Sequence, residues 1–373
     1  MESQFYQSYI NSDLVLKYKI NKAILRNTTR YLFDATEDQN EDNSNEPNYQ
    51  TRQVVIKMSL DNSTTKNEFY AARKAYMTIE KYTLPVLYTD VVENVQVLVQ
   101  PRYGVNMKTY FGEFGKGPRS PDSLGMKFTF PENQNSRRNS IFSVTSDFSF
   151  SEPASPNAVD AALALNSQKL LEIRYAFYQI IDALIYLQKA NIYHLDIKGE
   201  NILICPVSKK IKLIDFGFSR FTPVPKIMVV GTSRYCAPEI AQLNSTEENV
   251  SKHDVWSLGI CLYRTVSGKF PYENLEEVVG PHCYGGTPCG KAKNLNINLQ
   301  PENLKKFIKE LDVTKVVDGV TIDSTKTLKI YNKVQYVLSQ CLRVDPKERK
   351  TFVELLEEDL FLNEKEYLNM ENK

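Results

Sequence analysis

The pattern of hydrophobic and polar residues predicts strands in the first part of the chain and helices in the rest. Residues 54–58 (VVIKM) and 95–99 (VQVLV) are β-branched runs bounded by polar residues, which is typical of buried strands. Between these two runs, apolar residues recur at helical spacing, at Phe69, Ala72, Tyr76 and Ile79. The N-terminal part should therefore form a small sheet with one helix.

A longer helix is predicted from Ser167 to Lys189, and the chain after about residue 220 is mostly helical in pattern. The predicted helix has one apolar stripe, formed by Leu170, Ile173, Phe177, Ile181 and Leu184. Strands followed by helices indicate an α+β protein with a small β-rich lobe and a larger helical lobe.

Two polar stretches interrupt this pattern. Residues 36–50 are acidic and rich in Asn, and we interpret them as a long polar loop. Residues 112–157 contain many Ser, Pro, Gly and Asn, which predicts a disordered insertion. Ser140 within this insertion follows two arginines, so an upstream kinase is a candidate partner for the segment.

Composition narrows the class of protein. In 373 residues, 46 Lys and Arg nearly cancel 45 Asp and Glu, so nucleic acid and anionic membranes are not expected as main partners. Six separated cysteines do not form a disulfide framework. The sequence has no apolar run of about 18 residues, and residues 1–20 do not resemble a signal peptide. We therefore expect an intracellular protein of the cytoplasm, with the nucleus left open.

The segment YHLDIKGENILI at residues 193–204, with LIDFG at residues 213–217, has the spacing of a phosphoryl-transfer site. Such chemistry needs a base near the nucleophile, neutralised phosphate charge and metal ions held by oxygen ligands. We expect Asp196 to accept the proton of a substrate hydroxyl and Lys198 to hold the transferred phosphoryl group. Asn201 and Asp215 are the expected Mg²⁺ ligands.

These motifs resemble those of the eukaryotic protein kinases, of the serine/threonine type, over roughly residues 18–362. In that resemblance, Lys57 corresponds to the strand lysine that binds the α- and β-phosphates of ATP. Ala237-Pro238-Glu239 corresponds to the end of the activation segment, and Arg349 to the arginine that pairs with its glutamate. Residues 254–259 (DVWSLG) resemble the start of the central buried helix.

The resemblance implies a two-lobed kinase fold with ATP and Mg²⁺ as cofactors and a protein as substrate. The implied division of the chain is an N-terminal extension (1–17), an N-lobe (18–99), a hinge (100–104), a C-lobe (105–363) and a C-terminal tail (364–373).

Glu68 has two competing interpretations. It is the acid best placed to pair with Lys57 from the following helix, which would make it part of the ATP site. Alternatively, residues 65–68 (TKNE) form a capping box in which Glu68 bonds back at the start of that helix.

Two departures from the family pattern are visible. Leu25, Asn27 and Arg30 occupy the positions of the family's phosphate-covering glycines, and Arg30 is a candidate source of positive charge there. Leu195 replaces the family's phosphate-binding arginine, so the activation segment is expected to need no phosphate. Thr232, next to Gly231, is expected to contact the catalytic loop.

The predicted function is transfer of the ATP γ-phosphoryl group to Ser or Thr of a protein. The alternative is a pseudokinase, a binding or scaffold module, which the missing glycines favour and the catalytic and metal-binding residues oppose. A small-molecule or lipid kinase is the third hypothesis.

Overall fold

The structure is a computed structural model of the whole chain. For a few helical residues only the backbone is described. The described residues are 13–26, 30–37, 52–60, 63–112, 156–222, 231–241, 246–268, 270–271 and 324–371. Most of residues 36–50 and of 112–157 lie outside them, so the predicted polar loop and disordered insertion stay predictions.

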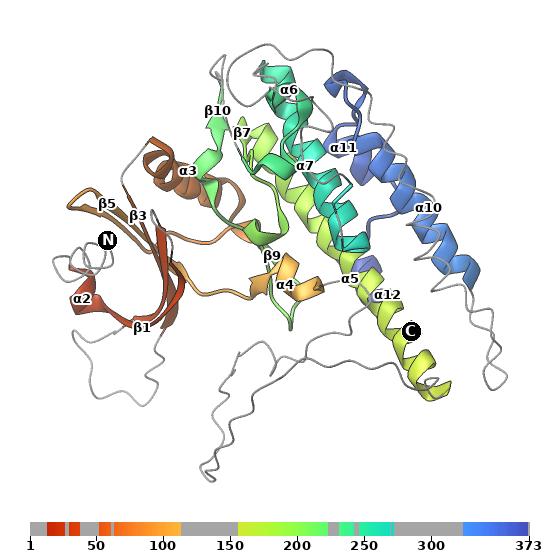
Figure 1. Cartoon of the computed structure of the whole chain (residues 1–373), viewed down its shortest axis with the longest axis horizontal. Helices are drawn as coiled ribbons and strands as arrows, with labels where there is room; N and C mark the ends of the chain where they lie inside the picture. Colours follow the sequence, from red (N-terminus) through yellow and green to blue (C-terminus); the bar gives the residue numbers. More distant parts are fainter. Residues whose placement is uncertain are drawn as a thin grey trace, which may run out of the picture.

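The N-terminal part folds as a five-stranded antiparallel sheet with the strand order β1-β2-β3-β5-β4 (Figure 1). The run predicted at residues 54–58 forms the middle of β3, and the run at 95–99 forms the first five residues of β5. The strands are β1 (Tyr18–Arg26), β2 (Arg30–Glu37), β3 (Arg52–Leu60), β4 (Tyr88–Val92) and β5 (Val95–Pro101).

Alternation along β3 decides which side chains reach the interior of this lobe. Val54, Ile56 and Met58 are fully buried in its hydrophobic core. Because successive side chains of a strand point to opposite faces, Val55 and Lys57 face the other side. That side lines the cavity described below.

Helix α3 (Ser63–Ile79) follows β3, as the helical spacing predicted. Its buried face is only partly the predicted one. Ala72 and Ile79 are buried as expected, whereas Phe69 and Tyr76 are only partly covered. The small side chains of Ala71 and Ala75 are fully buried instead, because they allow the helix to pack closely against the other lobe's core.

The rest of the chain forms a mainly helical lobe beside the sheet (Figure 1). The protein therefore has the predicted two-lobed α+β architecture. Two small sheets, with orders β6-β8-β9 and β10-β7, lie within this lobe. Its elements are β6 (Val105–Asn106), α4 (Met107–Phe111), α5 (Pro156–Lys189), β7 (Ile192–Tyr193), β8 (Ile202–Ile204), β9 (Ile211–Leu213), β10 (Arg220–Phe221), α6 (Pro238–Ala241), α7 (Glu247–Ser267), α10 (Ser324–Cys341), α11 (Phe352–Leu356) and α12 (Glu364–Glu371).

Helix α5 carries the predicted apolar stripe, and all five of its residues are buried: Leu170, Ile173, Phe177, Ile181 and Leu184. The helix begins at Pro156, eleven residues before the predicted start at Ser167. Residues 158–165 (AVDAALAL) are rich in Ala and Leu, which are strong helix formers, so they extend the helix. The last two residues of the predicted insertion, 156 and 157, thus belong to α5.

Helix α7 is the central buried helix that the DVWSLG motif indicated. It begins at Glu247, seven residues before the motif, because the Thr246 side chain caps it by accepting from the N–H of Asn249. The helix ends at Ser267 and is capped by Gly268, whose φ of 71° is the left-handed conformation that terminates helices. Trp256 in its middle is fully buried.

Arg349 and Glu239 form a buried, bidentate ion pair, as the resemblance implied. Arg349 donates from Nη1 and Nη2 to the two Glu239 carboxylate oxygens at 2.6 and 2.7 Å. The guanidinium also stacks over the ring of Trp256 at 5.0 Å. The pair therefore fixes the end of the activation segment to α7 and to the segment before α11.

The boundaries of the sheet lobe differ slightly from the predicted ones. β5 continues to Pro101, so the first two residues of the predicted hinge belong to the sheet. Helix α2 (Leu14–Lys17) precedes β1, and Leu14 is fully buried in the core of this lobe. The end of the predicted N-terminal extension is thus part of the folded lobe.

The predicted C-terminal tail is largely helical. Helix α12 covers residues 364–371, and Tyr367 stacks on Tyr175 of α5 with ring centroids 4.5 Å apart. The buried tyrosine explains why this polar sequence stays attached to the lobe. None of the described helices is both long and apolar enough to cross a membrane.

Removing one partner of the Arg349–Glu239 pair should strongly destabilise the protein, because a charge would remain buried without a counter-ion. We expect Arg349→Met to lower the free energy of unfolding by about 3–5 kcal/mol in urea titrations. The control is Lys333→Met, which breaks the exposed pair with Asp359 and should cost less than about 1 kcal/mol. Equal losses for the two variants would contradict this account of the buried pair.

Candidate active site between the lobes

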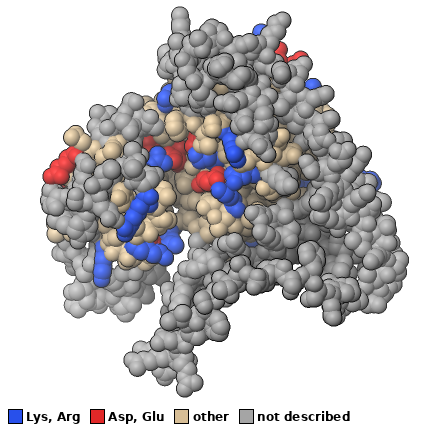
Figure 2. Space-filling model, viewed as in Figure 1, with Lys and Arg blue, Asp and Glu red and all other residues tan. Residues whose placement is uncertain are grey.

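A cavity of about 680 Å³ lies between the sheet and the helical lobe. Figure 2 shows Lys and Arg side chains gathered around this opening, with a few carboxylates among them. Five of the six residues predicted for the site line the cavity, and the sixth, Asp196, is bonded to two of them. The five are Lys57, Glu68, Lys198, Asn201 and Asp215.

Asp254 of α7 holds the backbone of the catalytic loop, residues 193–201. Its carboxylate accepts the N–H groups of His194 and Leu195 at 2.9 and 2.8 Å. Leu195 is fully buried and has a φ of 63°, a left-handed conformation that costs a non-glycine residue energy. Burial raises the pKa of Asp254 to about 7, and the two N–H groups act in the opposite direction. The strained turn is thus tied to the buried helix by two hydrogen bonds.

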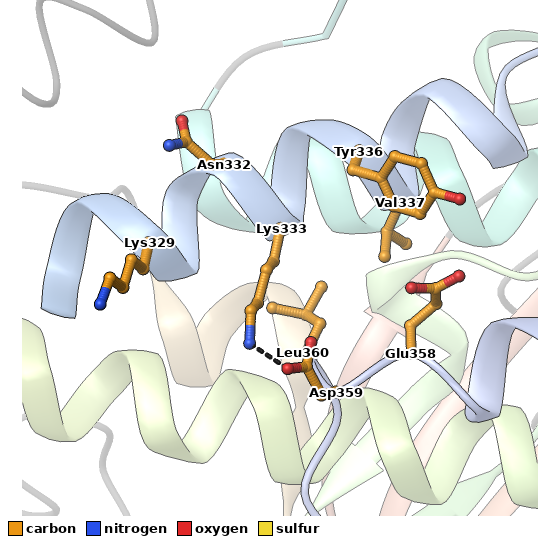
Figure 3. Close-up of a pocket in the computed structure, with 8 residues that line it drawn as sticks. All are labelled: Lys329, Asn332, Lys333, Tyr336, Val337, Glu358, Asp359 and Leu360. Carbon is orange, nitrogen blue, oxygen red and sulfur yellow. Dashed lines mark hydrogen bonds and ion pairs between the residues drawn. The ribbon is translucent and has the colours of Figure 1, made fainter.

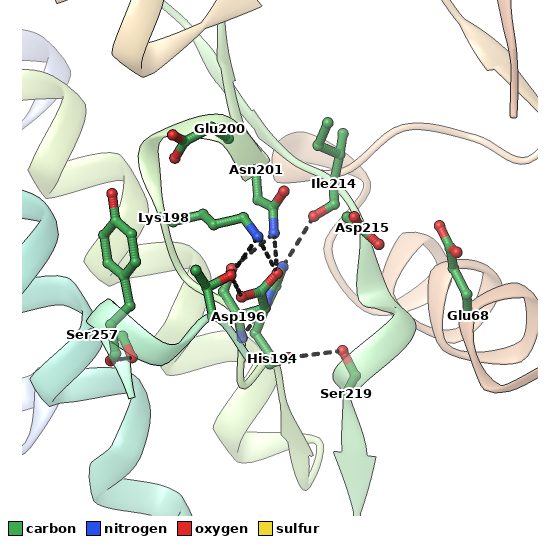
Figure 4. A network of polar contacts seen from close by, with 12 residues as sticks. Glu68, His194, Asp196, Lys198, Glu200, Asn201, Ile214, Asp215, Ser219 and Ser257 are labelled. Atoms are coloured by element: carbon green, nitrogen blue, oxygen red, sulfur yellow. Dashed lines mark hydrogen bonds and ion pairs between the residues drawn. The ribbon is translucent and has the colours of Figure 1, made fainter. Parts of the chain in front are cut away.

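Asp196 is the centre of a polar network (Figure 4). Its Oδ2 accepts from Lys198 Nζ at 2.7 Å and from Asn201 Nδ2 at 2.8 Å. Its Oδ1 accepts from the Thr232 hydroxyl at 2.8 Å, and the same hydroxyl accepts from Lys198 at 2.6 Å. The prediction that Thr232 contacts the catalytic loop is confirmed. These bonds fix the orientation of the Asp196 carboxylate.

Gly231 allows this contact because a side chain would not fit there. A Cβ at this position would lie 2.4 Å from the carbonyl oxygen of Leu195, and the φ of 76° also favours glycine. The activation segment can therefore approach the catalytic loop closely enough for Thr232 to reach Asp196.

Lys57 joins the two lobes electrostatically. Its Nζ donates to Glu68 Oε1 at 2.5 Å and to Asp215 Oδ1 at 3.0 Å. Helix α3 begins at Ser63, so Glu68 lies within the helix and not at its start. The capping-box interpretation is therefore wrong. Burial raises the pKa of Glu68, and the positive charge of Lys57 offsets part of that effect.

Asp215 receives a second cation from the sheet. Arg30, at the start of β2, donates to Asp215 Oδ2 at 3.1 Å. Burial acts to raise the pKa of Asp215, but Lys57 and Arg30 together hold it well below its usual value. Leu25 lines the same cavity, whereas Asn27 lies outside the described residues. A cation thus lies where the family has a glycine.

The residues after Asp215 anchor it to both lobes. Phe216 is buried and its ring centroid lies 4.8 Å from that of His194. His194 is fully buried, with its Nε2 3.2 Å from the Ile214 carbonyl, so its role is structural. From α3, Asn67 donates to the carbonyls of Gly217 and Ser219 at 3.2 and 2.7 Å.

Asn67 and His253 are two site-supporting residues that sequence reasoning missed. Asn67 precedes Glu68 and resembles an ordinary polar helix residue. His253 lies one residue before Asp254, and its Nδ1 accepts the backbone N–H of Ala237 at 3.3 Å. Its position beside the DVWSLG motif was the available signal, but spacing does not reveal that the ring faces the activation segment.

A smaller cavity of about 320 Å³ lies between α10 and residues 358–360 (Figure 3). Lys333 on its wall pairs with Asp359, and Glu358 pairs with Lys350. Asn332 on its wall points away from the Lys333–Asp359 pair (Figure 3), whereas in the larger cavity Lys198 and Asn201 both bond to Asp196. The larger cavity is therefore the candidate active site.

The larger cavity has suitable donors for a magnesium–nucleotide complex. Asn201 uses its amide nitrogen for Asp196, which leaves the amide oxygen for a metal, and Asp215 supplies a carboxylate. Both are the hard oxygen ligands that Mg²⁺ prefers. The described residues contain no group of three or more His, Cys, Asp or Glu that could hold a metal together. Phosphate oxygens would have to complete the coordination.

A sheet lobe and a helical lobe that enclose a lysine, two carboxylates and an asparagine define a two-lobed protein kinase fold. The chain belongs to the protein kinase domain family, because the model of that family matches residues 157–361, which are 205 of its 373 residues. The match covers most of the helical lobe, from α5 to α11. The sheet lobe with Lys57 and Glu68 is assigned from its structure.

Several named kinases are similar to part of the chain. The serine/threonine-protein kinase chk-2 of Caenorhabditis elegans is 32% identical over 160 residues, covering 42% of this chain and 33% of that protein. An Aurora kinase of Yarrowia lipolytica is 44% identical over 97 residues, 26% of this chain and 25% of its own length. The serine/threonine-protein kinase dkf-1 of Caenorhabditis briggsae is 37% identical over 110 residues, which are 28% of this chain and 14% of that protein. The chain therefore spans a third or less of each relative.

His253 predicts a pH dependence of stability. Burial, followed by the charge of Arg349, lowers its pKa from 6.5 to about 4. Between pH 6.5 and about 4, His253 is protonated in the unfolded protein but stays neutral in the folded protein. The free energy of unfolding should therefore fall as the pH drops from 6.5 towards 4. One pKa unit corresponds to about 1.4 kcal/mol, so the full effect is about 3 kcal/mol.

The measurement is urea unfolding of the wild type and of His253→Gln at several pH values between 7 and 5. Gln keeps a polar side chain but cannot be protonated, so its stability should fall less steeply. Parallel curves for the two proteins would show that His253 does not contribute to acid sensitivity.

Proposed function

We propose that the chain transfers the γ-phosphoryl group of ATP to Ser or Thr residues of a protein. One observation carries the proposal. Asp196, with Lys198 and Asn201 bonded to it, lies beside the same cavity in which Lys57 connects Glu68 to Asp215. The family and the names of the relatives support kinase activity of the serine/threonine type.

Each residue has a role that follows from its position. Asp196 accepts the proton of the substrate hydroxyl, since hydrogen bonds fix its carboxylate beside the cavity. Lys198, 2.7 Å from Asp196, places a positive charge where the transferred phosphoryl group passes. Lys57, oriented by Glu68, binds the phosphates of ATP.

Asn201 and Asp215 are the proposed ligands of Mg²⁺. When bound, the metal neutralises phosphate charge and orients the phosphates for in-line attack. The protein's contribution is to hold the amide and the carboxylate near each other, because the N–H of Ile214, next to Asp215, bonds to the Asn201 carbonyl at 3.0 Å. Asp196 fixes the amide of Asn201, and Lys57 and Arg30 fix Asp215.

The pseudokinase alternative finds no support in the relatives, which are named as kinases. The missing glycines were its basis, and Arg30 places a cation in that part of the cavity. As a user of ATP, the enzyme is proposed to work inside the cell, in the cytoplasm or nucleus. An upstream kinase acting on residues 112–157 is part of the proposal, although those residues lie almost entirely outside the described structure.

Neutralising Asp196 or Asp215 should abolish catalysis without unfolding the protein. Asp196→Asn keeps the shape but removes the proton acceptor, and Asp215→Asn weakens the metal site. We expect kcat to fall at least ~10²-fold in each, with melting temperatures close to that of the wild type.

The measurement is transfer of labelled phosphate from ATP to a mixed Ser/Thr peptide library. Asp359→Asn is the control, because Asp359 is exposed and does not line the candidate active site. If Asp196→Asn retained the wild-type rate, the role proposed for Asp196 would be wrong. If the wild type transferred nothing in the presence of ATP and Mg²⁺, the proposed function itself would fail.

A further inference from the structure

Beyond the catalytic residues, the outer wall of the large cavity contains a stack of two arginines on one aromatic ring. The guanidinium of Arg264 lies 4.5 Å from the ring centroid of Phe270, and that of Arg234 lies 5.1 Å from it. Tyr235 meets the same ring edge-on at 5.3 Å and accepts a hydrogen bond from Arg264 at 2.6 Å. All four residues line the cavity, so the stack is a built feature of its wall.

The carboxylate nearest to this stack is already neutralised. Glu200 Oε1 pairs with Lys108 at 2.9 Å and with Arg264 at 3.3 Å. Its second oxygen is buried. A basic residue of a peptide would therefore have to displace a cation of the protein to reach Glu200.

The charges around this part of the cavity favour a peptide with acidic residues. The described residues that line the cavity between the catalytic loop and the arginine stack include three cations and one carboxylate. The cations are Lys198, Arg234 and Arg264, and the carboxylate is Glu200. Arg234 is two residues from Thr232, which contacts Asp196 at 2.8 Å. Two residues span at most about 7 Å, which is about the length of two residues of an extended peptide.

We propose that Arg234 and Arg264 form a subsite for acidic side chains, Asp, Glu or a phosphorylated residue, within about three positions of the acceptor Ser or Thr. The proposal rests on the proposed function, because it defines the substrate of the same site. Arginine suits this role, since its planar guanidinium binds carboxylate or phosphate in a bidentate manner.

The test compares three peptides with one Ser flanked by Glu, by Ala or by Arg. We expect kcat/KM with the full chain to be at least about tenfold higher for the Glu peptide than for the Arg peptide, the effect of one charge-assisted hydrogen bond. Arg234→Glu and Arg264→Gln should each remove most of this preference. Arg343→Glu, an exposed arginine outside the cavity, is the matched control and should keep it.

Binding of the same fluorescent peptides is measured alongside transfer. Equal affinity for the Glu and Arg peptides, or a preference for Arg, would overturn the subsite. Tighter binding of the Glu peptide without any phosphoryl transfer would support the subsite and contradict the proposed kinase function. The two hypotheses therefore fail in different ways.

A separate observation concerns the inner end of the cavity, where two cations share one carboxylate. Lys57 holds Asp215 Oδ1 at 3.0 Å, and Arg30 holds Oδ2 at 3.1 Å. The Arg30 side chain is 30% exposed and lines the cavity, so its guanidinium is accessible to a ligand there. A divalent metal by itself would have to compete with both cations for Asp215.

We infer that Arg30 is a ligand of the nucleotide phosphates and couples nucleotide binding to metal binding. A phosphate is a stronger partner for the Arg30 guanidinium than Asp215. When the guanidinium moves from Asp215 to the phosphate, Asp215 Oδ2 becomes free for the metal. Arg30 thereby replaces the backbone N–H groups that a glycine-rich loop would supply. This inference also rests on the proposed function, because it assigns a residue to its nucleotide site.

The test is calorimetry with the full-length Arg30→Gln variant. ATP with Mg²⁺ should bind about tenfold more weakly than to the wild type, while adenosine, which has no phosphate, should bind equally well. Mn²⁺ alone, measured by electron paramagnetic resonance, should bind the variant more tightly, because Asp215 has lost a competitor. Lys22→Gln, an exposed lysine of β1, is the control for charge loss.

Three results would overturn the role of Arg30. They are unchanged ATP affinity in the variant, equal weakening of ATP and adenosine, and unchanged Mn²⁺ affinity. Absence of ATP binding to the wild type would instead contradict the proposed function, and the Mn²⁺ measurement would still decide whether Arg30 shields Asp215.

Discussion

The candidate site depends on one electrostatic constraint, the need to keep Asp215 charged and oriented between two lobes. Asp215 leaves the helical lobe in a left-handed turn with a φ of 63°, and two cations of the sheet lobe converge on it. Lys57 and Arg30 bind its two oxygens, and Glu68 binds Lys57 from α3. A buried cation or carboxylate without a partner costs free energy, so the cluster persists only while the two lobes keep this relative position.

The helical lobe supplies a second, independent anchor. The buried Asp254 and His253 of α7 bond the catalytic loop and the activation segment, respectively. Arg349 and Glu239 fix the end of that segment to the same helix. The proposed base, Asp196, is thus positioned through α7, and the proposed metal ligand, Asp215, by the sheet. The large cavity lies where the two supports meet.

Local features of the site were predictable from the sequence, because short chain segments fix their geometry. The six residues from Asp196 to Asn201 form one short segment, so the convergence of its polar side chains follows from their spacing. The apolar stripe of α5 was predicted in full for the same reason. The face of α3 was predicted only in part, because close packing favours Ala71 and Ala75 over the larger side chains.

Contacts between distant segments were less accessible. Nothing in the spacing predicts that Arg30 lies against Asp215, 185 positions later, since the register of β2 and the approach of the two lobes decide it. The choice between the two interpretations of Glu68 depended on where α3 begins. The arginine stack on Phe270 likewise joins the end of α7 to the activation segment, which only the fold brings together.

The central claim is that the charges around the cavity form one site for a nucleotide and a metal together. Its most direct test is calorimetric titration of the wild-type chain with ATP in the presence and absence of Mg²⁺. Since Asp215 and Asn201 need phosphate oxygens to complete a metal site, Mg²⁺ should strengthen ATP binding about tenfold or more. No binding of ATP, or binding that is indifferent to Mg²⁺, would contradict the account.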